Sequence, residues 1–202
     1  MTRIFLASRS SRRRELLKQI GIPYEIVLLR EDLTRGRDVD ETPLENEAPD
    51  NYVLRIAGSK AEVAAFYLGK RTRPSTPVVA GDTTVVSDGR ILGKPADREE
   101  AVRMLLGLAG REHQVLSAVA VCSKGRVYRA ISTSRVWFKA MSEDEIRRYV
   151  ATGEPMDKAG GYAIQGRAAI FVQHIAGSYS GIMGLPLAET AVLLEQAGVQ
   201  VL

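Results

Sequence analysis

The spacing of apolar residues along this chain alternates between the period of a strand and that of a helix. Apolar runs predict strands at residues 4–7, 24–29, 78–80, 84–87, 91–92, 115–122, 127–138, 169–175 and 199–202. Helical spacing predicts helices that begin near residues 10, 50, 97, 142 and 186 and end near residues 20, 67, 108, 152 and 197. Both hairpins and crossovers are needed to connect these elements. We therefore expect an α/β fold on a mixed, twisted, partly antiparallel sheet flanked by helices.

Polar residues at the predicted helix starts support these boundaries. Asp97 and Ser142 are each followed three residues later by a glutamate, which is the spacing of a capping box. Asp50 is expected to cap its helix, and Pro186 suits the first turn of the last one.

The length and composition predict a single domain over residues 1–202 with an ordinary core. Hydrophobic residues make up 45% of the 202 residues and charged residues 26%, as in globular proteins. No apolar run approaches the roughly 20 residues of a membrane span, and no signal peptide is visible. Cys122, the only cysteine, is expected in the core and cannot form an intrachain disulfide. We expect a cytoplasmic protein without a membrane partner.

The charges are unevenly distributed, although the net charge is only +4. Arginines crowd the first fourteen residues, whereas residues 38–50 are rich in aspartate and glutamate. A basic segment facing an acidic loop suits an anionic ligand that carries a metal better than it suits a nucleic-acid groove. Nucleic acid is the weaker alternative.

The first strand-to-helix turn predicts a phosphate site. Ser8, Ser10, Arg12 and Arg13 lie where free backbone N–H groups and the positive end of a helix dipole gather. Guanidinium groups bind phosphate oxygens in a bidentate manner. The alternative is a solvated basic turn in which Ser10 is merely the N-cap.

Asp82 is the leading candidate for a catalytic group. It follows an apolar strand and a glycine, so its carboxylate is expected at a strand end, where α/β sheets place their ligands. There it could act as a general base or hold a divalent metal; the alternative is an Asp turn. Lys60, on a helix face, and Lys94, between glycine and proline, are candidate phosphate ligands.

Residues 157–166 form the third unusual stretch. Two adjacent glycines and one further glycine would let the backbone approach a ligand closely. Gln165 carries both a donor and an acceptor, as recognition of a pyrimidine edge requires. His113 and His174 are expected to have structural roles, and Trp137 is expected in the core and not as a stacking platform.

The chain resembles the Maf family of nucleoside triphosphate pyrophosphatases over nearly its whole length. The matching motifs lie at residues 6–17, 40–42, 52–61, 81–83, 93–95, 153–155, 157–166 and 181–186. The family usually has proline where Ser11 stands, and the loop before Glu41 is somewhat long. The late motif at residues 157–166, with Lys158 and Gln165, resembles the version found in the subgroup that acts on dTTP and UTP.

The resemblance implies two lobes around a cleft and hydrolysis of a triphosphate to monophosphate and pyrophosphate with a divalent cation, Mg²⁺ or Mn²⁺. It also implies a role for each matching residue: Asp82 as general base, Glu41 and Asp82 at the metal, Arg13, Lys60 and Lys94 at the phosphates with Ser8 nearby, and Arg12, Thr83 and Gln165 in substrate choice. Family members are linked to removal of modified nucleotides and to arrest of cell division.

Two other functions are compatible with the same residues. One is a nucleotide- or RNA-binding regulator of cell division without turnover, which the basic N-terminal segment favours and the carboxylates Glu41 and Asp82 oppose. The other is a phosphatase that releases orthophosphate. A homodimer is a further possibility that the sequence leaves open.

Overall fold

The structure is a computed structural model of the chain that describes residues 3–30, 38–70 and 76–201. Its strands are β1 (Ile4–Ala7), β2 (Tyr24–Ile26), β3 (Val78–Ser87), β4 (Arg90–Leu92), β5 (Glu112–Ser123), β6 (Arg126–Phe138) and β7 (Val172–Ala176). Its α-helices are α1 (Ser11–Gln19), α2 (Pro49–Gly69), α3 (Arg98–Leu108), α4 (Glu143–Ala151), α5 (Tyr179–Ile182) and α6 (Leu187–Gln196). Three short 3₁₀ helices are η1 (Glu154–Asp157), η2 (Ala159–Gly161) and η3 (Arg167–Phe171).

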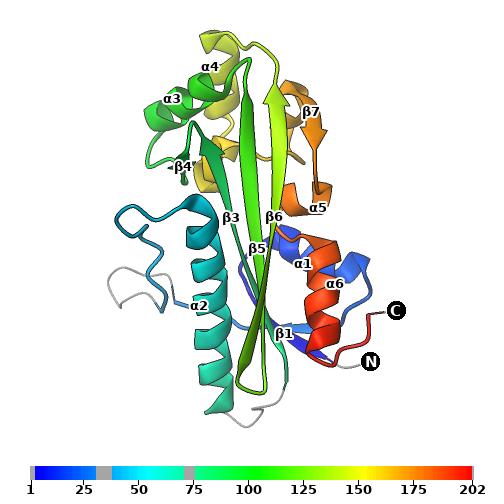
Figure 1. Cartoon of the computed structure of the whole chain (residues 1–202). Helices are drawn as coiled ribbons and strands as arrows, with labels where there is room; N and C mark the ends of the chain where they lie inside the picture. Colours follow the sequence, from blue (N-terminus) through cyan, green and yellow to red (C-terminus); the bar gives the residue numbers. More distant parts are fainter. Residues whose placement is uncertain (1–2, 31–37, 71–75, 202) are drawn as a thin grey trace.

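All of these strands belong to one mixed sheet. Its order is β2-β1-β3-β5-β6-β7, and β4 also pairs with β3. β1 is parallel to β2 and β3, whereas the other pairs are antiparallel. β5 and β6 form a long hairpin that runs through most of the molecule (Figure 1). The expected mixed, partly antiparallel sheet is confirmed.

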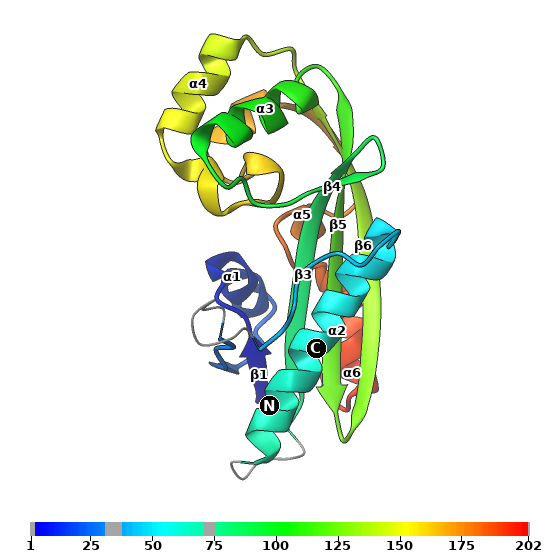
Figure 2. The same ribbon diagram turned by 90° about the vertical axis from the view of Figure 1, so that its left-hand side faces the viewer.

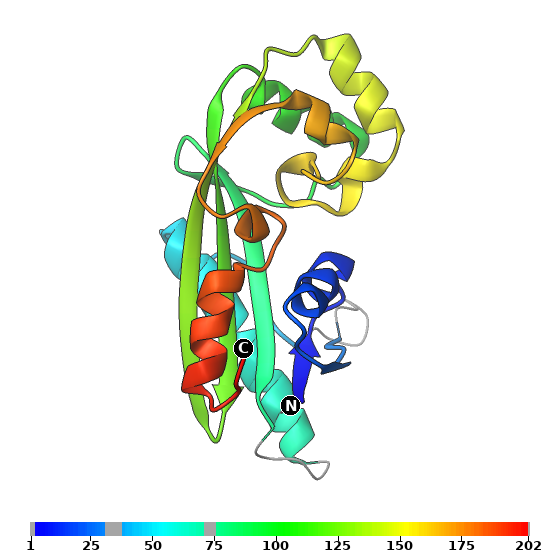
Figure 3. The same ribbon diagram turned by 90° about the vertical axis from the view of Figure 1, so that its right-hand side faces the viewer.

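Helices cover both faces of the lower half of the sheet. Successive side chains of a strand point to opposite faces, and here the side chains on each face are apolar and pack against helices. Ala80 of β3 and Ala118 of β5 pack under α2. Val79 and Val119, one residue along each strand, pack with α1 and α6 on the opposite face. Figures 2 and 3 show α2 on one side of the long strands and α1 and α6 on the other.

A third apolar cluster fills the upper end of the molecule. α3 and α4 and the η segments pack there against β3, β5 and β6, and Phe138 and Phe171 are the largest fully buried side chains of this cluster. His113 is buried in this cluster, and its Nε2 lies 2.8 Å from the Tyr162 hydroxyl. Burial lowers the pKa of His113 to about 4, so the ring is neutral at physiological pH and suits a structural role.

Trp137 differs from its expected place in the core, and its neighbour His174 lies at the surface. Trp137 is half-buried and His174 is exposed, and their rings lie against each other on the paired strands β6 and β7, with centroids 4.9 Å apart. The Arg135 guanidinium lies over the Trp137 ring at 5.2 Å. The two aromatic residues therefore shield the last strand pair of the sheet.

β3 is one continuous strand, not two short strands flanking residues 81–83. β5 pairs with it from Val78 to Val86 without interruption. On its other edge, pairing with β1 ends at Ala80 and pairing with β4 begins at Val85. Residues 81–84 thus lack a strand partner on that side among the described residues, and we call them the open edge of β3. In Figures 2 and 3, α1 and the yellow segment around residues 150–165 lie on the same side of β3, with the yellow segment above α1.

Several boundaries also differ from the expected ones. α2 begins at Pro49 after Ala48 as N-cap, so Asp50 lies in its first turn and is not the cap. β2 ends at Ile26, and the first part of the expected strand 169–175 belongs to η3. Residues 199–201 form no strand, and residue 202 lies outside the described part.

The caps expected at Ser10, Asp97 and Ser142 are present. Each side-chain oxygen accepts a hydrogen bond from the backbone N–H three residues later. Cys122 is buried, as expected. None of the helices among the described residues is both long enough and apolar enough to span a membrane.

Candidate active site

Lys60 holds two carboxylates together beside the open edge of β3. Its Nζ lies 2.8 Å from Oδ1 of Asp82 and 2.9 Å from Oε1 of Glu41. The Lys60 and Asp82 side chains are only 15% and 11% exposed, whereas that of Glu41 is 38% exposed. A cation between two partly buried anions reduces their mutual repulsion and keeps both near one point. The structure therefore gathers three of the predicted residues from a loop, α2 and β3.

The position of Asp82 corrects the expectation of a strand end. Asp82 lies in the middle of β3, paired across the sheet with Ala118. The carboxylate lies beside a strand that loses a neighbour, since β1 has ended and β4 has not begun. The carboxylate is therefore placed at a gap in the sheet edge and not at the end of a strand.

Arg13 binds β3 on its opposite face. Its Nε donates to the Gly184 carbonyl at 2.7 Å, and its two terminal nitrogens donate to Ser8 Oγ and Thr83 Oγ1, each at 3.3 Å. A side chain on Gly81 would place Cβ only 3.2 Å from Arg13 Nε, so this glycine makes room for the guanidinium. Arg13 thereby joins the first turn of α1 to β3 and to the chain after α5.

Burial and charge act in opposite directions on Arg13. Burial lowers its pKa from the usual 12.5, and the negative charges of Asp82 and Glu41 raise it. Arginine remains protonated in proteins, so this guanidinium keeps its positive charge. The Arg13 guanidinium is buried, keeps its charge and lies at the start of a helix. Such a group is suited to bind an anionic oxygen.

The turn before α1 has the structure expected of a helix N-cap. Ser10 Oγ accepts from Arg13 N at 3.4 Å, and Ser8 Oγ accepts from Ser10 N at 3.1 Å. Ser8 therefore contacts both the backbone of the turn and the Arg13 guanidinium. The N-cap interpretation of Ser10 is confirmed, and it is compatible with an anion site at the same turn.

Arg12, Lys94 and Gln165 are not part of the central group. Arg12 Nη1 donates to Glu15 on its own helix at 2.9 Å. Lys94 and Gln165 are exposed, and neither side chain makes a hydrogen bond or an ion pair with another described residue. The backbones of their segments do meet, because Gly160 N donates to the Gly93 carbonyl at 3.0 Å.

Two of the glycines in residues 160–166 pack closely against other parts of the protein, and the expected approach of this segment to a ligand stays a prediction. A Cβ on Gly160 would lie 2.8 Å from Val85 side-chain atoms, and one on Gly166 would lie 2.3 Å from Glu154 Oε1. Glu154 also accepts from the Tyr149 hydroxyl at 2.9 Å and from Arg167 N at 3.0 Å. These contacts set the shape of the turn that carries Gln165.

Tyr52 was not foreseen from the sequence. Its hydroxyl donates to the backbone carbonyl of Glu41 at 3.1 Å and so ties the acidic loop to α2. Burial together with the charges of Asp82 and Glu41 raises its pKa to about 12. The hydroxyl is therefore protonated and available as a donor. An isolated tyrosine in the first turn of a helix carries no sequence signal for this role.

The carboxylates Asp82 and Glu41 suit a divalent metal that arrives with its substrate. Mg²⁺ binds through one or two protein carboxylates, completed by water and phosphate oxygens. Among the described residues, no group of three or more His, Cys, Asp or Glu side chains could hold a metal alone. The carboxylates of Glu41 and Asp82, both paired with Lys60, match such a partial ligand set in number and in chemistry.

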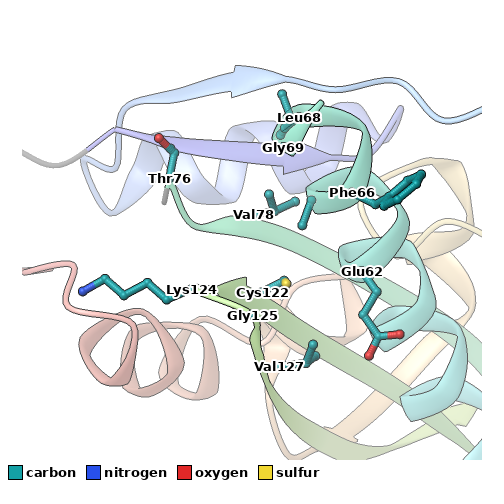
Figure 4. A pocket seen from close by; sticks show the side chains of 11 residues that line it. Glu62, Phe66, Leu68, Gly69, Thr76, Val78, Cys122, Lys124, Gly125 and Val127 are labelled. Carbon is teal, nitrogen blue, oxygen red and sulfur yellow. The ribbon is translucent and has the colours of Figure 1, made fainter. Parts of the chain in front are cut away.

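A pocket at the other end of the sheet contains none of these residues. It lies between the C-terminal part of α2 and the start of β3, with Phe66, Cys122 and Lys124 among its lining residues (Figure 4). Burial raises the pKa of the Cys122 thiol. A protonated, buried thiol is unsuited to nucleophilic chemistry.

Comparison with known proteins identifies the family. Over residues 3–197 the chain matches the family described as Maf-like protein. A dTTP/UTP pyrophosphatase of Nitrosomonas europaea is 56% identical over 198 residues, which cover 98% of this chain and 96% of the relative. Another, from Aromatoleum aromaticum, is 53% identical over 198 residues, with 97% and 96% covered.

A solved structure supports the fold alone. A HAM1 protein from Coxiella burnetii has a TM-score of 0.52 at 17% identity, covering 97% of this chain and 100% of that chain. The family match and the identities extend over nearly all of this sequence, including the segments that supply Arg13, Lys60 and Asp82. The chain belongs to the Maf family.

Proposed function

We propose that this chain is a nucleoside triphosphate pyrophosphatase that acts on dTTP and UTP. It would cleave the bond between the α- and β-phosphates and release a monophosphate and pyrophosphate. The names of its relatives support this activity. The observation that carries the proposal is Lys60 holding Glu41 and Asp82 at the open edge of β3. In these roles an acid–base group, a partial metal site and a cation would meet at one point.

Binding of the triphosphate is assigned to the cations and the helix start. The Arg13 guanidinium, Ser8 Oγ and the first N–H groups of α1 would bind phosphate oxygens. Lys60 and Lys94 would neutralise the charge that develops on the departing pyrophosphate. In phosphoryl transfer, catalysis consists mainly of such positioning and electrostatic stabilisation.

Asp82 is assigned to the attacking water. Its carboxylate would accept the proton as the water oxygen bonds to the α-phosphorus, while the electrons of the breaking bond leave with pyrophosphate. Glu41 and Asp82 would hold Mg²⁺ or Mn²⁺ together with the phosphates. Such a metal, when bound, offsets phosphate charge and lowers the pKa of bound water.

Recognition of the base is assigned to Gln165, Thr83 and Arg12. Gln165 is exposed, so its amide is available to a ligand. Thr83 lies at the open edge beside Arg13. We also propose a cytoplasmic location, where free nucleotides occur, and removal of modified pyrimidine nucleotides as a use of the activity. A homodimer remains a prediction.

A regulator without turnover is not favoured. A pure anion binder gains nothing from two carboxylates beside its phosphate site unless a metal intervenes. Release of orthophosphate instead of pyrophosphate would identify a phosphatase.

The proposal is tested by product analysis of the wild type and of Asp82→Asn. With Mg²⁺ or Mn²⁺, the wild type should convert UTP and dTTP to monophosphate and pyrophosphate, and chelation should stop the reaction. Asp82→Asn should lower turnover about 10²–10⁴-fold, the usual effect of losing a general base. Asp88→Asn is the matched control, because Asp88 is an exposed carboxylate just after the same strand.

Circular dichroism establishes that each variant is folded before its rate is compared. Near wild-type turnover of folded Asp82→Asn would falsify the role of Asp82. No turnover of any triphosphate by the folded, metal-loaded wild type would remove the pyrophosphatase proposal.

A further inference from the structure

A chain of hydrogen bonds leads from Arg13 through Thr83 into the protein interior. Arg13 Nη2 donates to Thr83 Oγ1 at 3.3 Å. Thr83 Oγ1 lies 2.9 Å from Ser117 Oγ, the residue that faces it across the β3–β5 pair. Ser117 Oγ in turn donates to the Gly181 carbonyl of α5 at 2.6 Å.

The direction of every hydrogen in this chain follows from the chemistry of its ends. A carbonyl oxygen only accepts, so the single hydrogen of Ser117 points to Gly181. Ser117 Oγ must then accept from Thr83, which commits the single hydrogen of Thr83 to the interior. A guanidinium only donates, so Thr83 Oγ1 also accepts from Arg13. Thr83 can therefore offer a ligand only a lone pair.

The interior end of this chain of hydrogen bonds, at Ser117 and Gly181, is held in place. Ser117 is 0% exposed, so no water competes for its hydrogen. Gly181 N donates to the N-cap Ser178 Oγ at 3.0 Å, and Gly184 N donates to the Gly181 carbonyl at 2.8 Å, so hydrogen bonds hold this turn in place. Thr83, in contrast, is partly exposed at the open edge. The buried Ser117 and Gly181 therefore fix the direction of the Thr83 hydroxyl hydrogen.

We infer that Ser117 is a positioning residue that holds Thr83 as a hydrogen-bond acceptor and so favours uracil and thymine over cytosine. N3 of uracil and thymine carries a hydrogen, whereas N3 of cytosine is an acceptor. This inference rests on the proposed function. Gln165 alone cannot make the distinction, because its amide presents a donor or an acceptor after a half-turn. A fixed acceptor rejects a base that lacks the donor.

The test compares kcat/KM for UTP and CTP, two ribonucleotides that differ only in the base and are similar in size. In Ser117→Ala the Thr83 hydrogen is released and can turn toward a ligand. The ratio of kcat/KM for UTP to that for CTP should fall about tenfold relative to the wild type. A purely structural role would lower both rates together and leave the ratio unchanged, and that result would overturn the inference.

Ser134→Ala is the matched control. Ser134 is also a buried serine, and its Oγ accepts from Ser178 N at 3.0 Å at the start of the same helix, but none of its hydrogen bonds reaches Thr83. Its loss should leave the UTP-to-CTP ratio at the wild-type value. A fall equal to that of Ser117→Ala would assign the effect to α5 and not to Thr83.

A double-mutant cycle isolates the link between the two hydroxyls. Thr83→Val should lower the ratio, Thr83→Ser should preserve it, and Ser117→Ala should add nothing in the Thr83→Val background. If Ser117→Ala does not fold, the comparison of Thr83→Val with Thr83→Ser tests the inference. Equal UTP-to-CTP ratios of kcat/KM in these two variants would overturn it. Wild-type protein that hydrolyses neither UTP nor CTP refutes the proposed function itself, whereas active wild type with an unchanged ratio in the variants refutes only the inference.

Discussion

At the scale of single residues, the loop that carries Glu41 is held by side chains of α2. Arg55 forms a fork on Glu47, with Nε and Nη2 each 2.6 Å from a carboxylate oxygen, and Nη2 also donates to the Thr42 carbonyl at 3.1 Å. Tyr52 binds the Glu41 carbonyl from the same helix. The position of Glu41 beside Lys60 therefore depends on neighbours that do no chemistry themselves.

The Glu47 fork predicts a pH-dependent contribution to stability. The hydrogen bonds from Arg55 lower the pKa of Glu47 to about 2 from 4.5. A carboxylate whose pKa is lowered on folding stabilises the folded state above its unfolded pKa and loses that effect as the pH falls through its folded pKa. Glu47→Gln should therefore have a lower urea midpoint than the wild type at pH 7. The difference should shrink as the pH falls below about 4.5 and disappear near 2.

Glu45→Gln, in the same loop, serves as the control for this titration. Glu45 is exposed and makes no ion pair with another described residue, so its replacement should have little effect at any pH. A Glu47→Gln difference that is the same at pH 7 and pH 3 would show that the fork does not stabilise the fold through its charge.

At the scale of elements, the segment from η1 to η3 is built around the Glu154 carboxylate. This carboxylate binds the Tyr149 hydroxyl of α4 and the first N–H of η3, and Gly166 passes directly against it. Gly166 has a φ of −106°, so glycine is required here by close approach and not by a left-handed backbone. The turn with Gln165 thus takes its shape from packing at the upper end of the molecule.

Gly166→Ala should destabilise the protein by about 1–3 kcal/mol, because its Cβ overlaps the Glu154 carboxylate. The same change in a Glu154→Ala background should cost less, since the overlapping atoms are gone. Gly107→Ala, on an exposed face of α3 with nothing within 4 Å of a Cβ, should be neutral or slightly stabilising. Urea unfolding measures all four variants. Additive costs of Gly166→Ala and Glu154→Ala would count against the overlap.

At the scale of the whole molecule, three long strands join two lobes: a lower lobe that contains α1, α2 and α6, and an upper lobe that contains α3 and α4. Val79 of β3 belongs to the cluster under α1 and α6, and Val85 of the same strand belongs to the cluster under α3 and α4. β5 and β6 likewise run through both regions (Figure 1). Neither lobe can unfold without exposing part of a strand on which the other depends.

We therefore expect a single cooperative unfolding transition. Trp137 fluorescence reports on the upper lobe, whereas far-ultraviolet circular dichroism reports on the whole chain. Leu105→Ala in the upper cluster and Leu194→Ala in the lower one each remove a side chain that is 0% exposed. Each should cost about 2–5 kcal/mol and shift both signals equally. A variant that shifts only one signal would show that the lobes unfold separately.

Sequence patterns sufficed where the relevant contacts are local. The caps at Ser10, Asp97 and Ser142 depend on residues three positions apart, so they were predicted correctly. Apolar periodicity likewise predicted a mixed sheet with flanking helices. The motifs also identified the Maf family, because their order along the chain is itself sequence information.

The tertiary structure decided everything that depends on residues far apart in the chain. The continuity of β3 through residues 81–83, a glycine and two polar residues, comes from pairing with β5, which local composition does not report. Ser117 meets Thr83 from 34 positions away, and Gly184 meets Arg13 from 171 positions away. Hydrogen bonds and burial between such residues exist only after the chain has folded. The sequence alone thus determined the family and the chemical groups, whereas folding alone determined their partners, their burial and the direction of their hydrogens.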